Sequence, residues 1–437
     1  MKNCIGIRHE NKDLTERRAP LTPDLVKKIV EEHGIRVLVE PSETRIFREA
    51  AYRDAGAEIS EDLSDCNIIF GVKEIPKASL QQDLTYCFFS HTIKAQDYNM
   101  PLLAKLMALG NTLLDYEVVT NEEGRRQIFF GNFAGYAGMI NSLWALGKRW
   151  AWEGIANPLE TIQQTLAYDT LADAETAIET VGETILREGL PREAGPLICG
   201  FTGYGQVSKG AQKIYDVLPV ETITPEELAG FYEKGDFSAN HVYKVEFHEK
   251  HMFVHARDEV FDLQEYFNHP ERYKNQFYQY TPFLTMIINA IYWEPTCPML
   301  ISKSDLKTLY EQFDKPNLKV IGDISCDIEG SMQMTVKATN STDPIYVFDP
   351  FTEAVTDGHA GRGPVMMTVD KLPAELPREA SDFFGNSLLP YVAGLAQTDF
   401  SEPLASMDIH PHFKKAMIVH KGELTSDFEY LKKYISE

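Results

Sequence analysis

The chain has 437 residues, of which 43% are hydrophobic, and its formal net charge is −23. This length is enough for two or more packed domains, and so acidic a surface argues against a protein that binds nucleic acid or an anionic membrane. The six cysteines lack zinc-knuckle or CxxC spacing, which indicates a reducing compartment and no metal site. Because no signal core, transit pattern or membrane-length apolar run is evident, we expect a cytoplasmic protein.

The first part of the chain alternates short β-rich runs with helical runs. The predicted strands lie in CIGIRHE, RVLVEPS, CNIIFGVKEIP and TYCFFSHTIKA. One predicted helix is TPDLVKKIVEEHG, with Thr22 as N-cap, Pro23 at its first position and Gly34 as its stop. A second lies in EAAYRDAGAEI and leads into another strand. Strand–helix alternation predicts a parallel α/β domain, in which site residues lie on loops at the carboxyl ends of strands.

A helical section is predicted next, from about Phe133 to Gly189, and its segment AGYAGMINSLWALGKRWAWEG is expected to form a long connecting helix. A second α/β unit begins at Gly195, and its later strands are expected in VYKVEFH, MIINAIYW and LKVIGDIS. The β-like runs PIYVFDP and VMMTVDKLP follow, and a last helical section, REASDFFGNSLLPYVAGLA, leads to the tail. The fold class is therefore α/β with two units.

The stretch GPLICGFTGYGQVSKGAQ, which starts at Gly195, predicts a strand, a glycine-rich turn and the first turn of a helix. In a dinucleotide site the first glycine permits a tight turn, the second lets the pyrophosphate approach the backbone, and the helix N-terminus donates free N–H groups. The spacing departs from the strict fingerprint, so an ordinary tight turn is the alternative. The expected cofactor-binding residues here are Gly203, Gly205, Gln206, Val207, Ser208 and Gly210.

The sequence leaves the choice between NAD and NADP open. An acid near the end of the second strand would bind the adenine ribose, and Glu221 lies at about the right distance, either at the end of that strand or inside it. Lys209 and Lys213 are candidates to hold a 2′-phosphate instead.

Basic residues recur where the strands of the first domain end. They lie in TERRAPLTP, GVKEIP, SHTIKAQ and EEGRRQIFFG, and include Arg18, Lys73, His91, Lys94, Arg125 and Arg126. In so acidic a chain this recurrence favours a receptor for carboxylates, since an arginine fork matches a carboxylate in two hydrogen bonds. A lysine and a histidine in one cleft can lower each other's pKa and transfer protons near neutral pH. Taken singly, each cation is equally compatible with a solvated surface residue.

These segments carry a family resemblance. The matching segments, in order, are ERRAPLTP, GVKEIP, FFSHTIKAQ, DYE, FGNFAGYAGMIN, FTGYGQVSKGAQ, HPERY, NAIYWE, DISCDIEGS and LPREASDFFGNSLLPYV. Nearly the whole chain resembles the lysine–ketoglutarate reductase part of the bifunctional aminoadipic semialdehyde synthases of animals and plants. The wider group is the alanine dehydrogenase and transhydrogenase N-terminal superfamily, which includes the fungal lysine-forming saccharopine dehydrogenases.

The resemblance implies two Rossmann-like α/β domains with the active site in the cleft between them. It divides the chain into a substrate-binding domain (1–135), connecting helices with a dinucleotide-binding domain (136–375), and C-terminal helices that return to the first domain (376–437). It assigns the acid–base pair to Lys73 and His91 and a carboxylate contact to Arg18. It places Lys94, Gln96, Glu117, Arg125 and Arg126 at other substrate positions, and Asp323 and Asp327 beside the nicotinamide.

The implied reaction is the condensation of lysine with 2-oxoglutarate and reduction by NADPH to saccharopine, in lysine degradation. The alternatives are an NAD-dependent, lysine-forming saccharopine dehydrogenase, another amino-acid dehydrogenase of the superfamily, and a non-catalytic nucleotide-sensing module. The expected partners are the small-molecule substrates, a separate saccharopine dehydrogenase chain that consumes the product, and other copies of this chain in a homo-oligomer.

Overall fold

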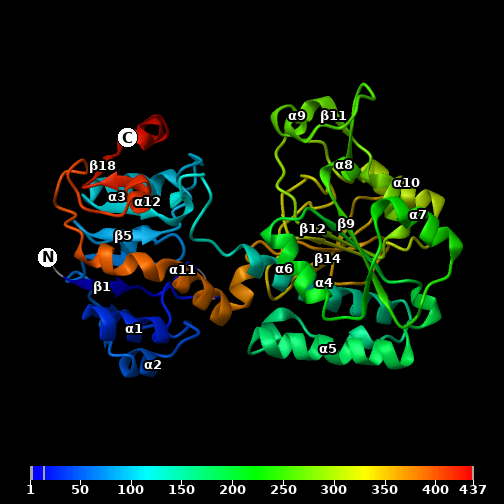
Figure 1. Ribbon diagram of the computed structural model, residues 1–437, viewed down its shortest axis with the longest axis horizontal. Coiled ribbons are helices and arrows are strands. Elements are labelled where there is room, and N and C mark those ends of the chain that lie inside the picture. The colour runs from blue at the N-terminus through cyan, green and yellow to red at the C-terminus, as the bar shows by residue number, and fades with distance from the viewer. Residues whose placement is uncertain (1–2, 13–14, 436–437) are drawn as a thin grey trace. The chain divides into compact units, whose positions relative to one another are not determined.

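The computed structural model describes residues 3–12 and 15–435 and shows two compact units, each with its own sheet (Figure 1). Unit 1 contains the described residues up to Phe130 together with those from Pro377 onwards. Unit 2 is Gly131–Leu376. The prediction of two α/β units with largely parallel sheets is confirmed.

Unit 1 is built on an eight-stranded sheet with the order β18-β17-β6-β5-β4-β1-β2-β3. The first six strands along the chain are parallel, and the last two are antiparallel to their neighbours. The bounds are β1 (Cys4–Ile7), β2 (Arg36–Val39), β3 (Glu58–Ile59), β4 (Ile68–Phe70), β5 (Thr85–Phe88), β6 (Thr112–Asp115), β17 (Met417–His420) and β18 (Glu423–Leu424). Because β1, β4, β5 and β6 are parallel neighbours, the loops that follow them meet at one edge of the sheet.

The helices of unit 1 are α1 (Pro23–His33), α2 (Glu49–Asp54), α3 (Met100–Ala108), α11 (Pro377–Gln397) and α12 (Pro411–Lys415). Helix α1 forms as predicted: Pro23 opens it, and Gly34 ends it in the left-handed region at φ 60°. The Thr22 side chain, however, makes no cap hydrogen bond. Helix α11 packs beside α1, so segments from the two ends of the sequence share one core (Figure 1).

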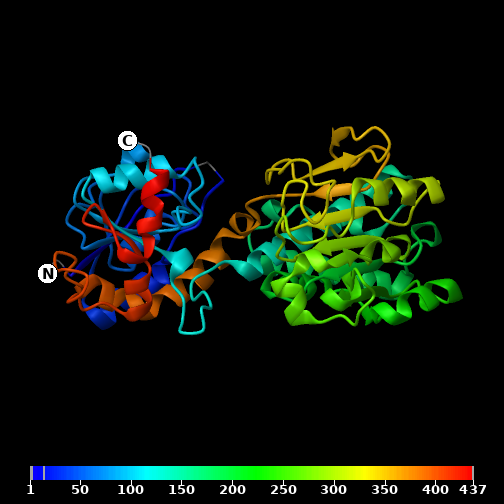
Figure 2. The same ribbon diagram turned by 90° about the horizontal axis from the view of Figure 1, so that it is seen from above.

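Unit 2 is built on a second eight-stranded sheet with the order β15-β14-β16-β13-β12-β7-β9-β8. The bounds are β7 (Ile198–Thr202), β8 (Val220–Thr222), β9 (Val242–Phe247), β12 (Met286–Asn289), β13 (Val320–Asp323), β14 (Ile345–Phe348), β15 (Val355–Asp357) and β16 (Val365–Met367). The third strand along the chain, β9, lies between β7 and β8. The antiparallel strands β14 and β15, gold in Figure 2, close the opposite edge.

The predicted helical section between the sheets forms two helices rather than one continuous run. They are α4 (Gly131–Trp152) and α5 (Leu171–Glu188), separated by residues 153–170, which contain two short 3₁₀ turns. The other helices of unit 2 are α6 (Gln206–Tyr215), α7 (Pro225–Lys234), α8 (Glu249–Met252), α9 (Leu263–Asn268) and α10 (Lys303–Gln312). Outside the main sheet, β10 (Phe253–His255) and β11 (Tyr273–Asn275) form a small antiparallel ribbon.

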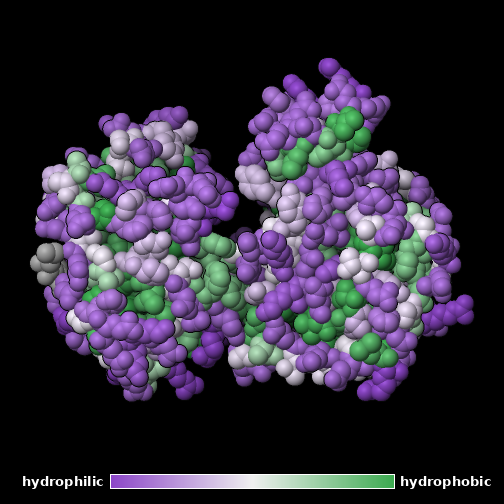
Figure 3. Space-filling model, in the orientation of Figure 1, coloured by the Kyte–Doolittle hydropathy of each residue, from purple (hydrophilic) through white to green (hydrophobic). Residues whose placement is uncertain are grey.

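Apolar residues fill the space between each sheet and its helices, and most of the surface in the view of Figure 3 is hydrophilic. This distribution agrees with the large negative charge of the chain. Among the residues that the structure describes, none of the helices combines the length and the apolar character needed to cross a bilayer.

Candidate active site

The loops after β1, β4 and β5 bring a lysine, a histidine and several carboxylates together in unit 1. Glu10, three residues after β1, is buried and accepts hydrogen bonds from the backbone N–H groups of Val72 (2.8 Å) and Lys73 (2.9 Å). Glu10 therefore fixes the loop after β4, which carries Lys73. Burial lowers the pKa of the Lys73 amine, and the nearby positive charge of Arg18 lowers it further.

Glu74 links Lys73's loop to His91. The Nδ1 atom of His91 lies 2.8 Å from Glu74 Oε1, and Lys12 Nζ lies 2.7 Å from Glu74 Oε2. Burial opposes ionisation of Glu74, but these two partners outweigh it and lower its pKa to about 2. A carboxylate on Nδ1 orients the ring and leaves Nε2 as the nitrogen for proton exchange.

His91 has a backbone conformation that non-glycine residues rarely adopt. Its φ is 52°, and its ring stacks on Phe89 with centroids 6.1 Å apart. The Asn99 side chain donates a hydrogen bond to the His91 carbonyl at 3.0 Å. Such strain persists where surrounding contacts over-determine it, as they often do at functional sites.

Asp115, the last residue of β6, holds the loops that carry His91 and Glu117. It accepts hydrogen bonds from the Ser90 N–H (2.9 Å), the Ser90 hydroxyl and the Glu117 N–H (2.7 Å). Burial raises the pKa of Asp115 to about 6, and these donors oppose the rise. One buried carboxyl therefore positions two of the predicted site residues.

Arg18 is buried and already paired. Its Nε and Nη2 atoms donate to the two oxygens of Glu16 at 2.7 and 2.6 Å, and its guanidinium lies 4.3 Å from the ring centroid of Phe130. Burial disfavours the ionised form of Glu16, yet Arg18 keeps the pKa of Glu16 below its ordinary value. Glu16 contacts only the Nε–Nη2 edge of the guanidinium, and Nη1 takes no part in this pair.

The remaining predicted substrate residues are not all drawn into this cluster. Arg126 donates to the buried Glu117 at 2.6 Å, which connects both to the Asp115 loop. Arg125 is 78% exposed and pairs with Glu123. Lys94 and Gln96 lie on the surface of the loop after β5, where Gln96 accepts the hydroxyl hydrogen of Tyr98.

In unit 2 the predicted glycine turn forms between β7 and α6. Gly203 has φ 85°, and Gly205 is the N-cap of α6, whose first turn contains no acidic residue and no side-chain cap. A Cβ atom at Gly205 would meet no atom within 4 Å, so the backbone faces open space. Gln206 is exposed and Val207 half-buried in this first turn. Free N–H groups beside a bare glycine fit a pyrophosphate.

Two residues predicted to bind the cofactor face the interior instead. A Cβ at Gly210 would lie 2.4 Å from the Asn132 carbonyl oxygen, so Gly210 allows α6 to pack closely on α4. Ser208 is fully buried, and its hydroxyl accepts from Gln212 at 3.2 Å. Gly210 does not follow the fingerprint spacing, and in this structure it allows two helices to pack closely.

Asp323, at the end of β13, is the centre of a buried network. It accepts from Asn289 Nδ2 (2.8 Å) and Thr335 Oγ1 (2.5 Å), and Asn289 in turn accepts from Thr202 Oγ1 (2.7 Å). Burial raises the pKa of Asp323 to about 6 despite these donors. Asp323 therefore ties the ends of β7, β12 and β13 together, while Asp327, in the following loop, is half-buried.

The structure does not bring Glu221 to the glycine turn. Glu221 lies in the middle of β8, where it pairs with Tyr243 of β9, and Tyr243 pairs with Ile198 at the start of β7. Its carboxylate is exposed and lies 3.5 Å from His241. Of the two placements that the sequence left open, the structure has Glu221 inside its strand.

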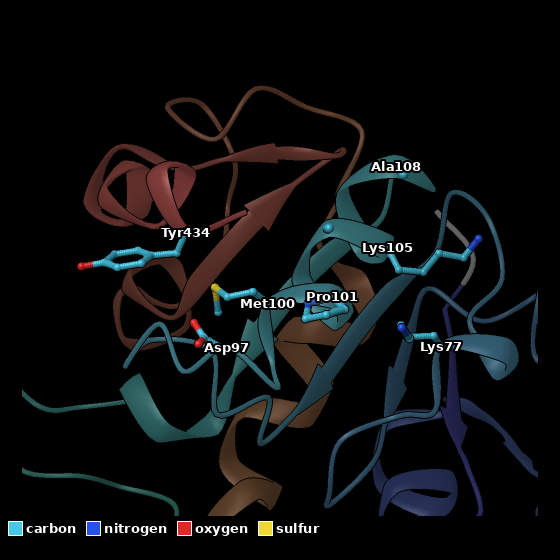
Figure 4. A pocket seen from close by; sticks show the side chains of 8 residues that line it. Lys77, Asp97, Met100, Pro101, Lys105, Ala108 and Tyr434 are labelled. Carbon is cyan, nitrogen blue, oxygen red and sulfur yellow. The ribbon is translucent and has the colours of Figure 1, made fainter. Parts of the chain in front are cut away.

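A surface pocket of unit 1 lies away from the acid–base cluster. Its lining consists of Lys77, Asp97, Met100, Pro101, Ala104, Lys105, Ala108 and Tyr434. Figure 4 shows the lysines on one side of Met100 and Pro101 and Tyr434 on the other. Because Lys73, Glu74 and His91 do not line it, we assign no chemistry to this pocket.

Sequence reasoning missed the carboxylates that organise the unit 1 cluster. Glu74 directly follows Lys73, and Glu16 lies two residues before Arg18, so a search for acids beside the predicted cations would have found both. Glu10 had a weaker signal, as an acid at the end of a predicted strand, and Asp115 had none, because no strand was predicted before it. Their partners are backbone N–H groups, which leave no mark in the sequence.

Two family models match the chain. The alanine dehydrogenase/PNT N-terminal domain matches residues 6–137, and the C-terminal domain of the same family matches residues 274–427. Among solved structures, an L-alanine dehydrogenase superposes with a TM-score of 0.62 at 19% identity, covering 99% of this chain and 100% of that one. A transhydrogenase from Sinorhizobium meliloti superposes with a TM-score of 0.57 at 13% identity, covering 97% and 100%. These structural matches show a shared fold.

Curated relatives match over nearly the full chain. Alpha-aminoadipic semialdehyde synthase of Arabidopsis thaliana is 37% identical over 98% of this chain and 41% of its own length. The mitochondrial enzyme of that name from Mus musculus is 36% identical over 99% of this chain and 48% of its own length. The chain thus spans less than half the length of these relatives. Saccharopine dehydrogenase [NAD(+), L-lysine-forming] of Emericella nidulans is 27% identical over 89% and 91% of the two chains. With both domain models matched in order, the chain belongs to the alanine dehydrogenase/PNT family.

Proposed function

We propose that this protein is an oxidoreductase that joins L-lysine to 2-oxoglutarate and reduces the resulting imine to saccharopine with a reduced nicotinamide nucleotide, in lysine degradation. The observation that carries the proposal is the Lys73–Glu74–His91 cluster beside the buried Arg18. The names of the relatives, and the share of this chain that they match, support the same reaction.

The reaction needs several proton transfers at one carbon. The ε-amine of lysine adds to the keto carbon of 2-oxoglutarate, and the carbinolamine loses water to give an imine. When bound, the nicotinamide nucleotide supplies the hydride that reduces this imine, so the products are saccharopine, the oxidised nucleotide and water. A base must accept a proton during addition, and an acid must donate one to the departing hydroxyl.

Lys73 and His91 are suited to these transfers. The lowered pKa of Lys73 increases the fraction of neutral amine at neutral pH, so this side chain can accept a proton as well as donate one. His91 exchanges protons through Nε2 while Glu74 holds Nδ1. The strained His91 backbone and the Asn99 and Asp115 contacts keep the imidazole in one orientation, which lowers the entropy lost on reaching the transition state.

The substrates together carry three carboxylates, and the arginines are suited to bind them. We propose that Arg18 contacts one carboxylate through Nη1 while Glu16 holds its other edge. Arg126, half-exposed and anchored by Glu117, is the second candidate. The solvent-facing Arg125, Lys94 and Gln96 are assigned to the rim, where they would attract anionic substrate rather than orient it.

The experiment is oxidation of NADPH and of NADH with lysine and 2-oxoglutarate, omitting each substrate in turn. We expect nucleotide oxidation only when both substrates are present, with saccharopine as the product by mass spectrometry. Oxidation at an equal rate without lysine would exclude the condensation, because the nucleotide would then be consumed without an amine. The resemblance to the semialdehyde synthases favours NADPH, and the likeness to a fungal NAD-linked enzyme over 91% of its length favours NADH. This choice depends on unit 2, not on the acid–base cluster.

A further inference from the structure

The strand order of unit 2 puts an unexpected strand next to the glycine turn. In a dinucleotide-binding sheet, the acid that binds the adenine ribose lies near the end of the strand beside the glycine-turn strand. That neighbour is normally the second strand along the chain. Here it is the third, β9, because β9 lies between β7 and β8. The acid to examine is therefore at the end of β9.

Glu246 occupies that position. In the parallel register it pairs with Phe201, and the next pair joins Phe247 to Thr202, the residue before Gly203. Its counterpart Glu221 lies level with Ile198, three residues before Phe201 on β7, which is roughly 10 Å further down the sheet at about 3.3 Å per residue. Glu246 is therefore the last acid inside β9 and lies three residues nearer to the glycine turn than Glu221, while Glu249 follows the strand and accepts from the Tyr204 hydroxyl at 3.4 Å.

The Glu246 carboxylate is held in place from two sides. Its Oε2 accepts from Gln212 Nε2 of α6 at 2.6 Å, and its Oε1 lies 3.0 Å from His248 Nε2. The ring of Tyr204, within the glycine turn, stacks on His248 with centroids 4.5 Å apart. The Glu246 side chain remains 35% exposed, so it is preorganised and still open to a ligand.

The cations around Glu246 are largely engaged by other acids. Lys244 pairs with Asp216 at 2.6 Å, and Lys213 pairs with Glu175 at 3.2 Å and lies over the Tyr136 ring. Lys209 and Lys213 both line the surface hollow that contains Gln212 and Glu246, and Lys209 has no acidic partner among the described residues. A 2′-phosphate placed beside Glu246 would meet a fixed carboxylate, with Lys209 and the already paired Lys213 to offset the repulsion.

We propose that Glu246 accepts hydrogen bonds from the adenine-ribose hydroxyls and repels a 2′-phosphate, so that this chain selects NAD(H) over NADP(H). The proposal rests on the proposed function only in that unit 2 binds a nicotinamide nucleotide. It does not depend on which amino acid or keto acid is converted. It assigns to Glu246 the role that the sequence suggested for Glu221.

The test is equilibrium binding, measured by isothermal titration calorimetry of the full chain with NADH and with NADPH. We expect the wild-type protein to bind NADH at least about tenfold more tightly, the scale of one charged hydrogen bond. Glu246→Gln should weaken NADH binding, improve NADPH binding and reduce the preference by about tenfold. Glu221→Gln, which removes the same charge from β8, is the matched control and should leave both affinities unchanged.

Equal or tighter binding of NADPH by the wild-type protein would overturn the proposal, as would an unchanged preference in a folded Glu246→Gln variant. Loss of preference in Glu221→Gln would return the ribose contact to β8. Urea unfolding of each variant checks that the fold is retained. If NADH binds selectively but lysine and 2-oxoglutarate give no turnover, the proposed reaction fails while the assignment of Glu246 stands.

Discussion

Unit 1 and unit 2 place their candidate site residues at the same structural position, the carboxyl ends of parallel strands, but they use different groups there. Unit 1 gathers charged side chains that pair with one another, such as Glu16 with Arg18 and Glu74 with His91. Unit 2 presents bare backbone at Gly205 and the uncapped first turn of α6. Proton transfer needs side chains with adjusted pKa values, whereas a pyrophosphate needs N–H groups that side chains do not cover.

This difference predicts that substitutions in the two units affect different measurements. Changes in the unit 1 cluster should affect turnover or the stability of the buried ion pairs. Changes at the glycine turn should affect nucleotide affinity. A single substitution that changed both turnover and nucleotide affinity would show that the two units do not divide these tasks.

The largest expected effect is on turnover. His91→Gln and Lys73→Met should each lower kcat by about 10²–10⁴-fold, the usual contribution of a general acid or base. NADH affinity, measured by calorimetry, should stay within about twofold because neither residue belongs to unit 2. The double variant should lose much less than the product of the two single losses if the residues act as a unit.

Lys94→Met is the matched control for Lys73→Met, because it removes the same charge from an exposed position on the loop after β5. It should keep near-normal kcat. A His91 variant with near-normal turnover, or a Lys94 variant as impaired as the Lys73 variant, would show that the acid–base chemistry lies elsewhere.

The second expected effect is on stability. Arg18→Ala removes the guanidinium that pairs with the buried Glu16, and breaking a buried pair typically costs about 3–5 kcal/mol of unfolding free energy. Glu16→Gln combined with Arg18→Gln removes both charges and should be less destabilising than Arg18→Ala alone. Urea denaturation of the wild-type protein and the variants measures this difference. If Arg18→Ala left stability unchanged, Glu16 would not depend on Arg18 for its burial.

The third expected effect distinguishes two glycines of α6: Gly205, its N-cap, and Gly210, inside the helix. Gly205→Asp places a carboxylate in the open space where the pyrophosphate is expected, so nucleotide affinity should fall by tenfold or more while the unfolding free energy is kept. Gly210→Ala should do the reverse: its Cβ would lie 2.4 Å from the Asn132 oxygen, and such overpacking costs about 1–3 kcal/mol. Calorimetry and urea denaturation on both variants give the comparison. Unchanged nucleotide affinity in a folded Gly205→Asp protein would remove this turn from the cofactor site.

The sequence predicted local features well. The helix that begins at Pro23 and stops at Gly34, the strand before Gly203 and the loops that carry Lys73 and His91 all follow from periodicity, proline and glycine, and the structure confirms them. These features depend on residues that are neighbours in the chain. The expectation that the active site lies in a cleft between the two domains stays a prediction.

The features that the sequence did not predict depend on long-range packing. Spacing pointed to Glu221 because the second strand usually borders the first, and only the sheet order reveals that β9 takes that place. Gly210 was predicted to bind the cofactor, and its close contact with α4, which precedes it by many residues in the chain, was not predicted. The same holds for Asp323, whose partners Asn289 and Thr335 come from other segments.

The smallest expected effect contrasts the half-buried Glu74 with the buried Glu375. Glu74 of unit 1 has a histidine and a lysine as partners, and its pKa is about 2. Glu375 of unit 2 accepts a hydrogen bond from Asn141 at 2.8 Å, and no lysine, arginine or histidine of the described residues forms an ion pair with it. Burial raises the pKa of Glu375 to about 7, and the Asn141 hydrogen bond only partly opposes this rise.

Glu375 should therefore make the protein less stable as pH rises. At pH values between its unfolded pKa near 4.5 and its folded pKa of about 7, the Glu375 carboxyl is ionised in the unfolded chain but still protonated in the folded chain. Ionisation therefore favours unfolding in this pH range.

Glu375→Gln keeps an acceptor for Asn141 but cannot ionise. Its unfolding free energy relative to wild type should rise by about 2 kcal/mol from pH 5 to pH 7.5. The other carboxyls with a raised pKa, Glu10, Asp115 and Asp323, are present in both proteins and cancel in this difference. Urea denaturation at the two pH values measures it, with the exposed Glu160→Gln as control. A Glu375→Gln difference that is constant with pH would mean that Glu375 is ionised in the folded state, and that unit 2 tolerates an unpaired buried charge after all.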